Sequence, residues 1–131
     1  MRSRSRKKSN PRLLLIEQDP RVIDEIRALF ANPGLECEVA LSVETAMKIL
    51  GERRMDAVLV DAAVDSLSDG MAGLVRQLKG EDKAMKIVIF NGTARKTAQR
   101  KLRRHGVDGY LRARSSHGML TRSVRRALGL E

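Results

Sequence analysis

The chain has 131 residues, of which 42% are hydrophobic, and this length supports one domain around a single core. Its longest apolar runs contain about four residues, as in 13–16 and 57–60, so we expect no membrane span and no secretory signal. One cysteine, Cys37, excludes an internal disulfide, and two histidines give no zinc set; both observations favour a reducing, cytoplasmic location.

Charge is distributed unevenly along the chain, whose net charge is +10. Residues 1–12 carry a charge of +6, residues 13–82 carry −7 and residues 83–131 carry +11. Separation of this kind predicts an acidic end and a basic face on the folded protein. Because residues 1–11 are rich in Ser, Arg and Lys and nearly without large apolar side chains, we expect a flexible basic tail there and one domain over 12–131.

The predicted domain begins with a buried strand and an amphipathic helix. Residues 12–16 (RLLLI) contain four consecutive apolar side chains, the pattern of a strand that is covered on both faces. Pro20 can occupy the first turn of the next helix, which should end at residues 32–34 (NPG). A weaker strand is predicted at 35–40, and Ser42 can cap a second helix.

The second half of the chain continues the alternation of strands and helices. Its predicted elements are, in chain order, a strand at 57–60, a helix from about residue 70, a strand at 86–90, a turn at 91–93, a helix at about 94–105, a strand at 109–111 and a helix that contains Leu120, Val124 and Leu128. Five strands and five helices joined by right-handed crossovers predict an α/β fold with a doubly wound, five-stranded parallel sheet. The functional crevice of such a sheet lies at the carboxyl ends of its strands.

Polar residues follow several of these strands. Glu17 and Gln18 follow the first strand, Asp61 ends the third and Asn91 follows the fourth. Because the carboxyl ends of parallel strands meet at one edge of the sheet, the acidic groups of the first and third strands should converge on one pocket.

The chain resembles the receiver domain of two-component response regulators, a flavodoxin-like (βα)5 fold. The segments that carry the resemblance are LLLIEQDP (13–20), DAVLVD (56–61), KIVIFNG (86–92) and GVDGYL (106–111). The intervals agree as well, with 30 residues from Asp61 to Asn91 and 19 from Asn91 to Tyr110. The resemblance extends from Arg12 to Leu128.

The resemblance implies a role for each matched position. It makes Asp61 the phosphoacceptor of a phosphorelay and implies a switch at Asn91, Tyr110 and Ala113. It implies a Mg²⁺ site formed by Glu17, Gln18, Asp61 and the backbone carbonyl of Ala63. The resemblance also implies that the domain is a signalling module and not an enzyme, and that its partner is a histidine kinase or another signalling protein.

Three matched positions depart from the family pattern. Gln18 replaces a carboxylate, so we expect Mg²⁺ to bind weakly. Asn91 replaces a rotatable Ser or Thr hydroxyl, and Ala113 replaces a lysine that pairs with the phosphoryl oxygens. Neighbouring residues on an extended strand point to opposite faces, so neither Arg112 nor Arg114 is expected to replace that lysine unless the loop rearranges. Impaired phosphorylation and an uncoupled switch, as in a pseudo-receiver, are therefore predicted.

A basic face is predicted on the fourth helix, the fifth strand and the fifth helix, the side that receivers use for partners. The candidate partner-binding residues there are Arg95, Arg100, Arg104, Arg112, Arg114 and Arg122. A solvated charged face, a docking surface for an acidic protein and a nucleic-acid surface remain open interpretations. Aromatic side chains that could stack on bases are nearly absent, and we recognise no helix-turn-helix segment after the domain. Both observations disfavour nucleic acid as the partner.

The main functional hypothesis is a stand-alone receiver domain that acts through protein–protein interaction. The alternative is a nucleic-acid-binding protein on a receiver scaffold, which would use the basic tail and the basic face. A flavodoxin-like cofactor protein is disfavoured because residues 17–20 (EQDP) lack the hydroxyl- and glycine-rich phosphate loop of that class.

Overall fold

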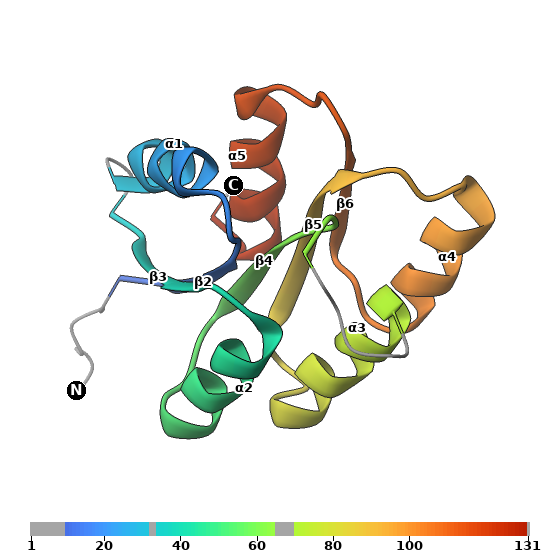
Figure 1. Ribbon diagram of the computed structural model, residues 1–131, viewed down its shortest axis with the longest axis horizontal. Helices are drawn as coiled ribbons and strands as arrows, with labels where there is room; N and C mark the ends of the chain where they lie inside the picture. The colour runs from blue at the N-terminus through green and yellow to red at the C-terminus, as the bar shows by residue number, and fades with distance from the viewer. Residues whose placement is uncertain (1–9, 32–33, 65–69, 131) are drawn as a thin grey trace.

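The protein is a three-layer α/β domain, seen here in a computed structural model that describes residues 10–31, 34–64 and 70–130. Its strands are β2 (Arg12–Ile16), β3 (Glu36–Ala40), β4 (Ala57–Asp61), β5 (Lys86–Gly92) and β6 (Gly109–Arg112). Its helices are α1 (Pro20–Ala31), α2 (Val43–Glu52), α3 (Gly70–Glu81), α4 (Lys96–Arg104) and α5 (His117–Ala127). The predicted alternation of five strands with five helices is confirmed in the described residues (Figure 1).

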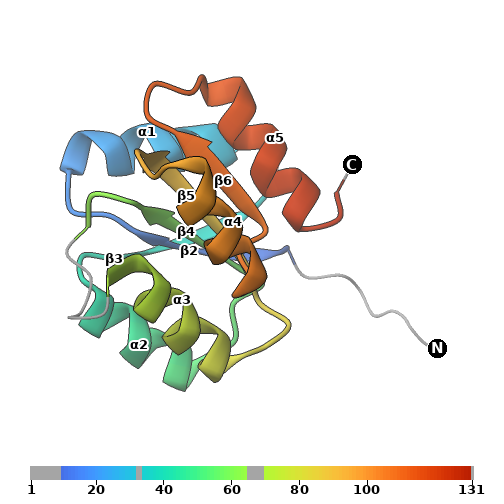
Figure 2. The same ribbon diagram turned by 90° about the vertical axis from the view of Figure 1, so that its right-hand side faces the viewer.

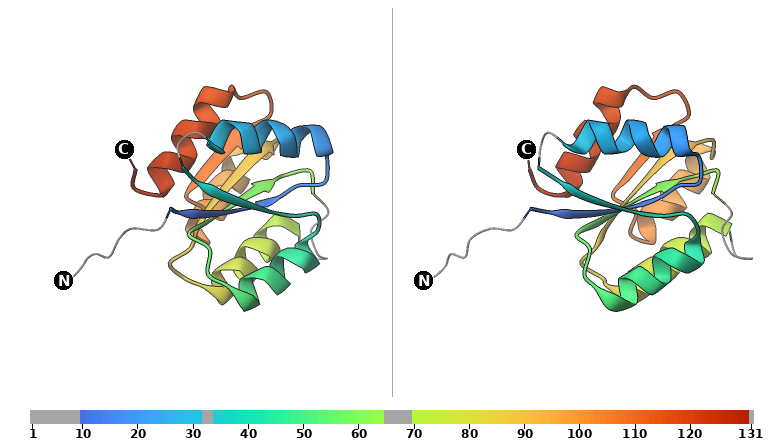
Figure 3. Two further views of the ribbon diagram at one scale, coloured as in Figure 1. Left: turned by 90° about the vertical axis from the view of Figure 1, so that its left-hand side faces the viewer. Right: turned by 60° about the vertical axis from the view of Figure 1, so that its left-hand side comes forward.

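All strand pairs in the sheet are parallel, in the order β3-β2-β4-β5-β6. Helices α1 and α5 cover one face, and α2 and α3 lie on the other (Figures 1 and 2). The edge strand β3 closes the side of the sheet away from α4 (Figure 3). The doubly wound fold predicted from the sequence is therefore confirmed.

Two apolar cores lie on opposite faces of the sheet because side chains alternate along each strand. On β2, Leu14 and Ile16 join the core under α2, α3 and α4, whereas Leu13 and Leu15 join the core under α1 and α5. All four are fully buried, and every residue of β4 is buried too. Continuous apolar runs in these central strands thus follow from burial on both faces.

Helix starts follow the predicted signals. Pro20 is the first residue of α1, where its missing N–H costs no hydrogen bond. The hydroxyl of Ser42 accepts a hydrogen bond of 3.0 Å from the Thr45 N–H and caps α2. Residues 32–33 of the predicted helix stop lie outside the described residues.

One boundary was predicted wrongly, because β5 does not end in a turn at residue 91. Its pairing with β6 continues to Gly92, which lies opposite Arg112 and whose carbonyl accepts the Ala113 N–H at 2.9 Å. The register shifts between Ile89 and Gly92, and Asn91 takes a left-handed conformation with φ of 59°. A bulge with Asn in this conformation is an ordinary way to redirect a side chain beside a site.

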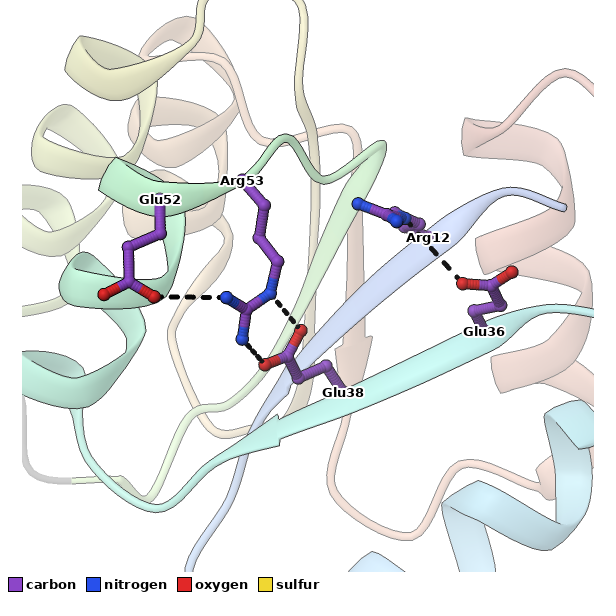
Figure 4. Close-up of polar contacts among 5 residues, drawn as sticks. All are labelled: Arg12, Glu36, Glu38, Glu52 and Arg53. Carbon is purple, nitrogen blue, oxygen red and sulfur yellow. Dashed lines mark hydrogen bonds and ion pairs between the residues drawn. The ribbon is translucent and has the colours of Figure 1, made fainter. Parts of the chain in front are cut away.

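Ion pairs join the edge strand β3 to Arg12 of β2 and to Arg53, which precedes β4. Arg53 contacts Glu38 and Glu52, and Arg12 lies 3.7 Å from Glu36, measured from Nε to Oε1 (Figure 4). The Arg53 hydrogen bond holds the pKa of Glu38 below its usual value. These exposed pairs lie at the opposite end of the strands from the predicted crevice, and each adds little stability.

The start of the predicted domain can be followed from Asn10. The Pro11 carbonyl accepts a hydrogen bond from the Glu36 N–H at 3.0 Å, so the chain is joined to β3 one residue before β2 begins. Most of the predicted basic tail, residues 1–9, lies outside the described residues. Within the described part, none of the helices is both long and apolar enough to cross a membrane.

Candidate functional site

The parallel register brings three polar residues to one edge of the sheet. Ile16 lies opposite Val60 in the pairing of β2 with β4, so Glu17 and Asp61 follow at the same level. Asp61 is paired with Phe90 of β5, next to Asn91. Glu17 and Asp61 are 4% and 7% exposed and are the buried charged residues in the described part of the chain. The predicted convergence of acidic groups is present.

Asp61 is held by two donors on one oxygen. Its Oδ1 accepts hydrogen bonds from the backbone N–H of Ala63 at 2.8 Å and from the side-chain amide of Asn91 at 3.1 Å. The left-handed backbone at residue 91 directs that amide toward Asp61. Asn91 can therefore donate to an anion at this site, but its planar amide cannot rotate as a hydroxyl does.

Glu17 is a buried carboxyl group with one satisfied oxygen. Its Oε2 accepts the backbone N–H groups of Gln18 at 2.9 Å and Asp19 at 3.2 Å. Its Oε1 is buried without a hydrogen-bond partner in the described structure. Burial, and next the contact with Asp61, raises the pKa of Glu17 to about 7, although the two backbone donors act in the opposite direction.

The carboxylate pair fits a divalent cation. Two facing carboxylates have no donor between them when both are ionised, which explains the unpartnered Oε1 of Glu17. A hard cation would satisfy that oxygen and bind Asp61 as well. The Gln18 side chain is exposed, and described residues contain no cluster of three or more His, Cys, Asp or Glu that could hold a metal. The site offers two carboxylates and not three.

The Tyr110 ring packs directly over Gly92. A Cβ atom on Gly92 would lie 2.3 Å from the Tyr110 ring, far inside van der Waals contact. The Tyr110 hydroxyl accepts a hydrogen bond of 2.8 Å from the Ala94 N–H, so both contacts hold the hydroxyl end of the half-buried ring. Neither Gly92 nor Ala94 was identified from the sequence; a glycine directly after Asn91, two residues from the end of an apolar strand, was the available signal.

A cleft of about 260 Å³ adjoins Asp61 between α1 and α5. Its lining residues are Val22, Glu25, Ile26, Asp61, Phe90, Asn91, Leu111, Arg112, Arg114, Ser115, His117 and Leu120. The lining combines apolar side chains with charged groups that include Asp61, Arg112 and Arg114. Ala113, at the expected lysine position, is not among them.

Both arginines beside Ala113 line this cleft, and the backbone around them is not the extended strand on which the sequence prediction was based. β6 ends at Arg112, and the chain turns so that the Ser115 N–H bonds the Arg112 carbonyl at 3.1 Å. Arg114 has a left-handed backbone with φ of 71°. The prediction assumed an extended strand through Arg114, and strand alternation does not apply within a turn.

The other candidate partner-binding residues are exposed on α4 and α5. Arg95 is the N-cap residue of α4, Arg100 and Arg104 lie within α4, and Arg122 lies on α5. The ion pairs of the described residues that involve Arg12 and Arg53 lie elsewhere, and none includes these four arginines. The predicted basic face therefore stands open to solvent.

Replacing Glu17 with Gln should remove a pH-dependent loss of stability. Below about pH 4.5 Glu17 is protonated in both the folded and unfolded states, and above about pH 7 it is ionised in both. Between these values only the unfolded state loses the proton, so stability should fall as pH rises, by about 1–3 kcal/mol. The Glu17→Gln protein should therefore have a higher free energy of unfolding than the wild-type protein at pH 8 and the same free energy of unfolding at pH 4.

The measurement is urea unfolding at pH 4 to 8 with EDTA present, which removes divalent cations. Glu25→Gln serves as the matched control because Glu25 is exposed on α1. The same pH dependence in the wild-type and Glu17→Gln proteins would contradict the assignment.

The model of the response regulator receiver domain family matches residues 13–125. The chain therefore belongs to this family and is a receiver domain of two-component signalling. A curated relative, the transcriptional activator protein PfeR of Pseudomonas aeruginosa, is 29% identical over 102 residues, which are 78% of this chain. Those residues are 32% of PfeR, so the chain spans about a third of the relative's length.

Solved receiver structures have the same fold. The receiver domain of sensor histidine kinase PA1611 from Pseudomonas aeruginosa PAO1 aligns with a TM-score of 0.74 at 20% identity, over 92% of this chain and 98% of that one. That structure holds a magnesium ion in its active-site cleft. A CheY-like receiver domain from Methanospirillum hungatei JF-1 aligns with a TM-score of 0.82 at 17% identity, over 92% and 95% of the two chains.

Proposed function

We propose that this receiver domain accepts a phosphoryl group on Asp61, slowly, and works as an interaction module in the cytoplasm and not as an enzyme. The observation that carries the proposal is the buried Glu17–Asp61 carboxylate pair with the Asn91 amide at the carboxyl end of the sheet. Three parts of a receiver site are thus in one place. The positions of Gln18 and Ala113 support slow transfer, because one anionic ligand and one cation are missing.

The chemistry uses the oxygen of Asp61 that its neighbours leave for attack. Oδ1 is occupied by the Ala63 and Asn91 donors, so Oδ2 is the nucleophile. With acetyl phosphate as donor, an electron pair of Oδ2 forms a bond to phosphorus while the bond from phosphorus to the acetyl oxygen breaks, and acetate leaves with that electron pair. A bound Mg²⁺ would be held by Glu17 and Asp61, with the Ala63 carbonyl, and would neutralise charge on the transferred group.

Incubation with acetyl phosphate and Mg²⁺ should add one phosphoryl group to the wild-type protein and none to Asp61→Asn. Intact-mass spectrometry measures the added group, and omission of Mg²⁺ should suppress it. Asp19→Asn is the matched control because Asp19 is an exposed carboxylate near the site. Labelling of Asp61→Asn, or no labelling of the wild type at any donor concentration, would refute the proposal.

The basic face supports an acidic protein partner, such as a histidine kinase or another signalling protein. It presents exposed cations on α4 and α5, and the charge of residues 83–131 is +11. Electrostatic complementarity of this kind increases the rate of association. Charge reversal at Arg100 and Arg104 should therefore slow binding to such a partner.

Nucleic acid is a second candidate partner, favoured by the same exposed cations of α4. Binding to DNA duplex would weaken with salt, with a log-log slope near −0.9 for each phosphate neutralised. Fluorescence anisotropy with labelled duplex and single strands across a salt series tests this candidate. Absence of binding at low salt would refute the nucleic-acid hypothesis and favour an acidic protein as the partner of the basic face.

A further inference from the structure

The loss of the family's lysine leaves the phosphoryl site without a cation from residue 113. The Ala113 N–H is bonded to the Gly92 carbonyl at 2.9 Å, which ties residue 113 to β5. Its methyl side chain carries no donor. A phosphoryl group on Asp61 would bring two negative charges to a place that already holds Glu17, so a nearby cation has a strong effect there.

Arg114 has the position and the freedom to supply that cation. It lines the same cleft as Asp61 and Asn91, and its side chain is exposed. The left-handed backbone of residue 114, at φ of 71°, takes it out of the strand alternation that governs β6. Arg112 also lines the cleft, but it is the last residue of β6 and is paired with Gly92, so its backbone is fixed in the strand.

Few groups compete for the Arg114 guanidinium. None of the ion pairs found in the described residues involves Arg114. Besides Asp61, the acid that lines the cleft is Glu25, from α1, and the remaining titratable groups are Arg112 and, at the start of α5, His117. A dianionic phosphoryl group on Asp61 would attract a guanidinium more strongly than the single exposed carboxylate of Glu25 does.

We propose that Arg114 binds the phosphoryl oxygens on Asp61 and takes the place of the missing lysine. The inference rests on the proposed function. The guanidinium donates two parallel N–H···O bonds and stays protonated throughout, so the side chain contributes charge and orientation without a proton transfer. A lysine ammonium would bind the phosphoryl group as a point charge, whereas the planar guanidinium of Arg114 would bind it through two N–H donors from the loop after β6.

The test uses beryllofluoride with Mg²⁺ as a non-covalent phosphoryl analogue, with binding followed by fluorine NMR. Arg114→Gln should weaken binding about ten- to a hundredfold, the loss expected for one charge-assisted hydrogen bond. Arg112→Gln is the matched control from the same loop, and Arg122→Gln controls for net charge. Both controls should stay within about threefold of the wild type. The Nε–H signal that is lost in Arg114→Gln should shift when the analogue binds to the wild type.

Two further variants separate binding from folding. Arg114→Gly accepts the left-handed backbone without strain and should lose the same affinity as Arg114→Gln. Adding Ala113→Lys to Arg114→Gln should restore affinity. Unchanged affinity in Arg114→Gln, or an equal loss in Arg112→Gln, would overturn the assignment to Arg114 while leaving Asp61 as phosphoacceptor. A wild-type protein that binds no analogue would overturn the proposed function and this inference together.

Discussion

Gly92→Ala protein is expected to lose the packed position of Tyr110. The new methyl group would lie 2.3 Å from the aromatic ring, and backbone pairing of Gly92 with β6 prevents the strand from moving away. The ring must therefore leave, and the Ala94 N–H loses its acceptor. Overpacking costs about 1–3 kcal/mol and a lost hydrogen bond about 0.5–1.5 kcal/mol, so we expect a clear fall in the free energy of unfolding.

Tyrosine fluorescence measures this displacement directly. Tyr110 is the only tyrosine and the chain has no tryptophan, so the emission reports one ring. Quenching by iodide should increase in Gly92→Ala, whereas Gly80→Ala, which has open space at its Cβ position on α3, should leave it unchanged. Gly92→Ala combined with Tyr110→Ala should be less destabilised than the sum of the single changes. Unchanged quenching in Gly92→Ala would show that the ring does not rest on Gly92.

The parallel sheet was predictable because its signals are local and repeated. Residues 13–16 and 57–60 are continuous apolar runs, which are typical of strands that are covered on both faces. Pro20 and Ser42 mark helix starts through the chemistry of their own backbone and side chain. The carboxylates Glu17 and Asp61 could be placed together because parallel strands fix the edge at which each one ends.

The details that decide how the site works were not predictable in the same way. The bulge at Asn91 depends on the pairing of Gly92 with Arg112, a contact between residues twenty positions apart. The turn after Arg112 places Arg114 on the cleft, and no local rule predicts a left-handed arginine, because that conformation is unfavourable for its side chain. Each depends on tertiary contacts that override the local preference.

The position of Tyr110 is expected to be the same with and without a phosphoryl analogue on Asp61. A ligand shifts a two-state equilibrium only by its differential affinity for the two states. In the receiver family that difference comes from a switch hydroxyl and a lysine, and here Asn91 and Ala113 stand in their places. Asn91 is bonded to Asp61 without any ligand, and Gly92 with Ala94 already holds the Tyr110 ring.

Backbone amide NMR spectra with and without beryllofluoride and Mg²⁺ test this expectation, with Tyr110 fluorescence as a second readout. Shifts should stay near Asp61 and Arg114, and iodide quenching of Tyr110 should not change. The matched comparison is a double variant with Asn91→Thr and Ala113→Lys, which restores both missing groups. Each restored charge-assisted hydrogen bond is worth about 1.5–3 kcal/mol, so the analogue should shift the Tyr110 equilibrium of this variant by roughly tenfold or more. Changes that spread to Tyr110 in the wild-type protein would show instead that Asn91 or Arg114 transmits the signal, and that Gly92 permits the ring to move.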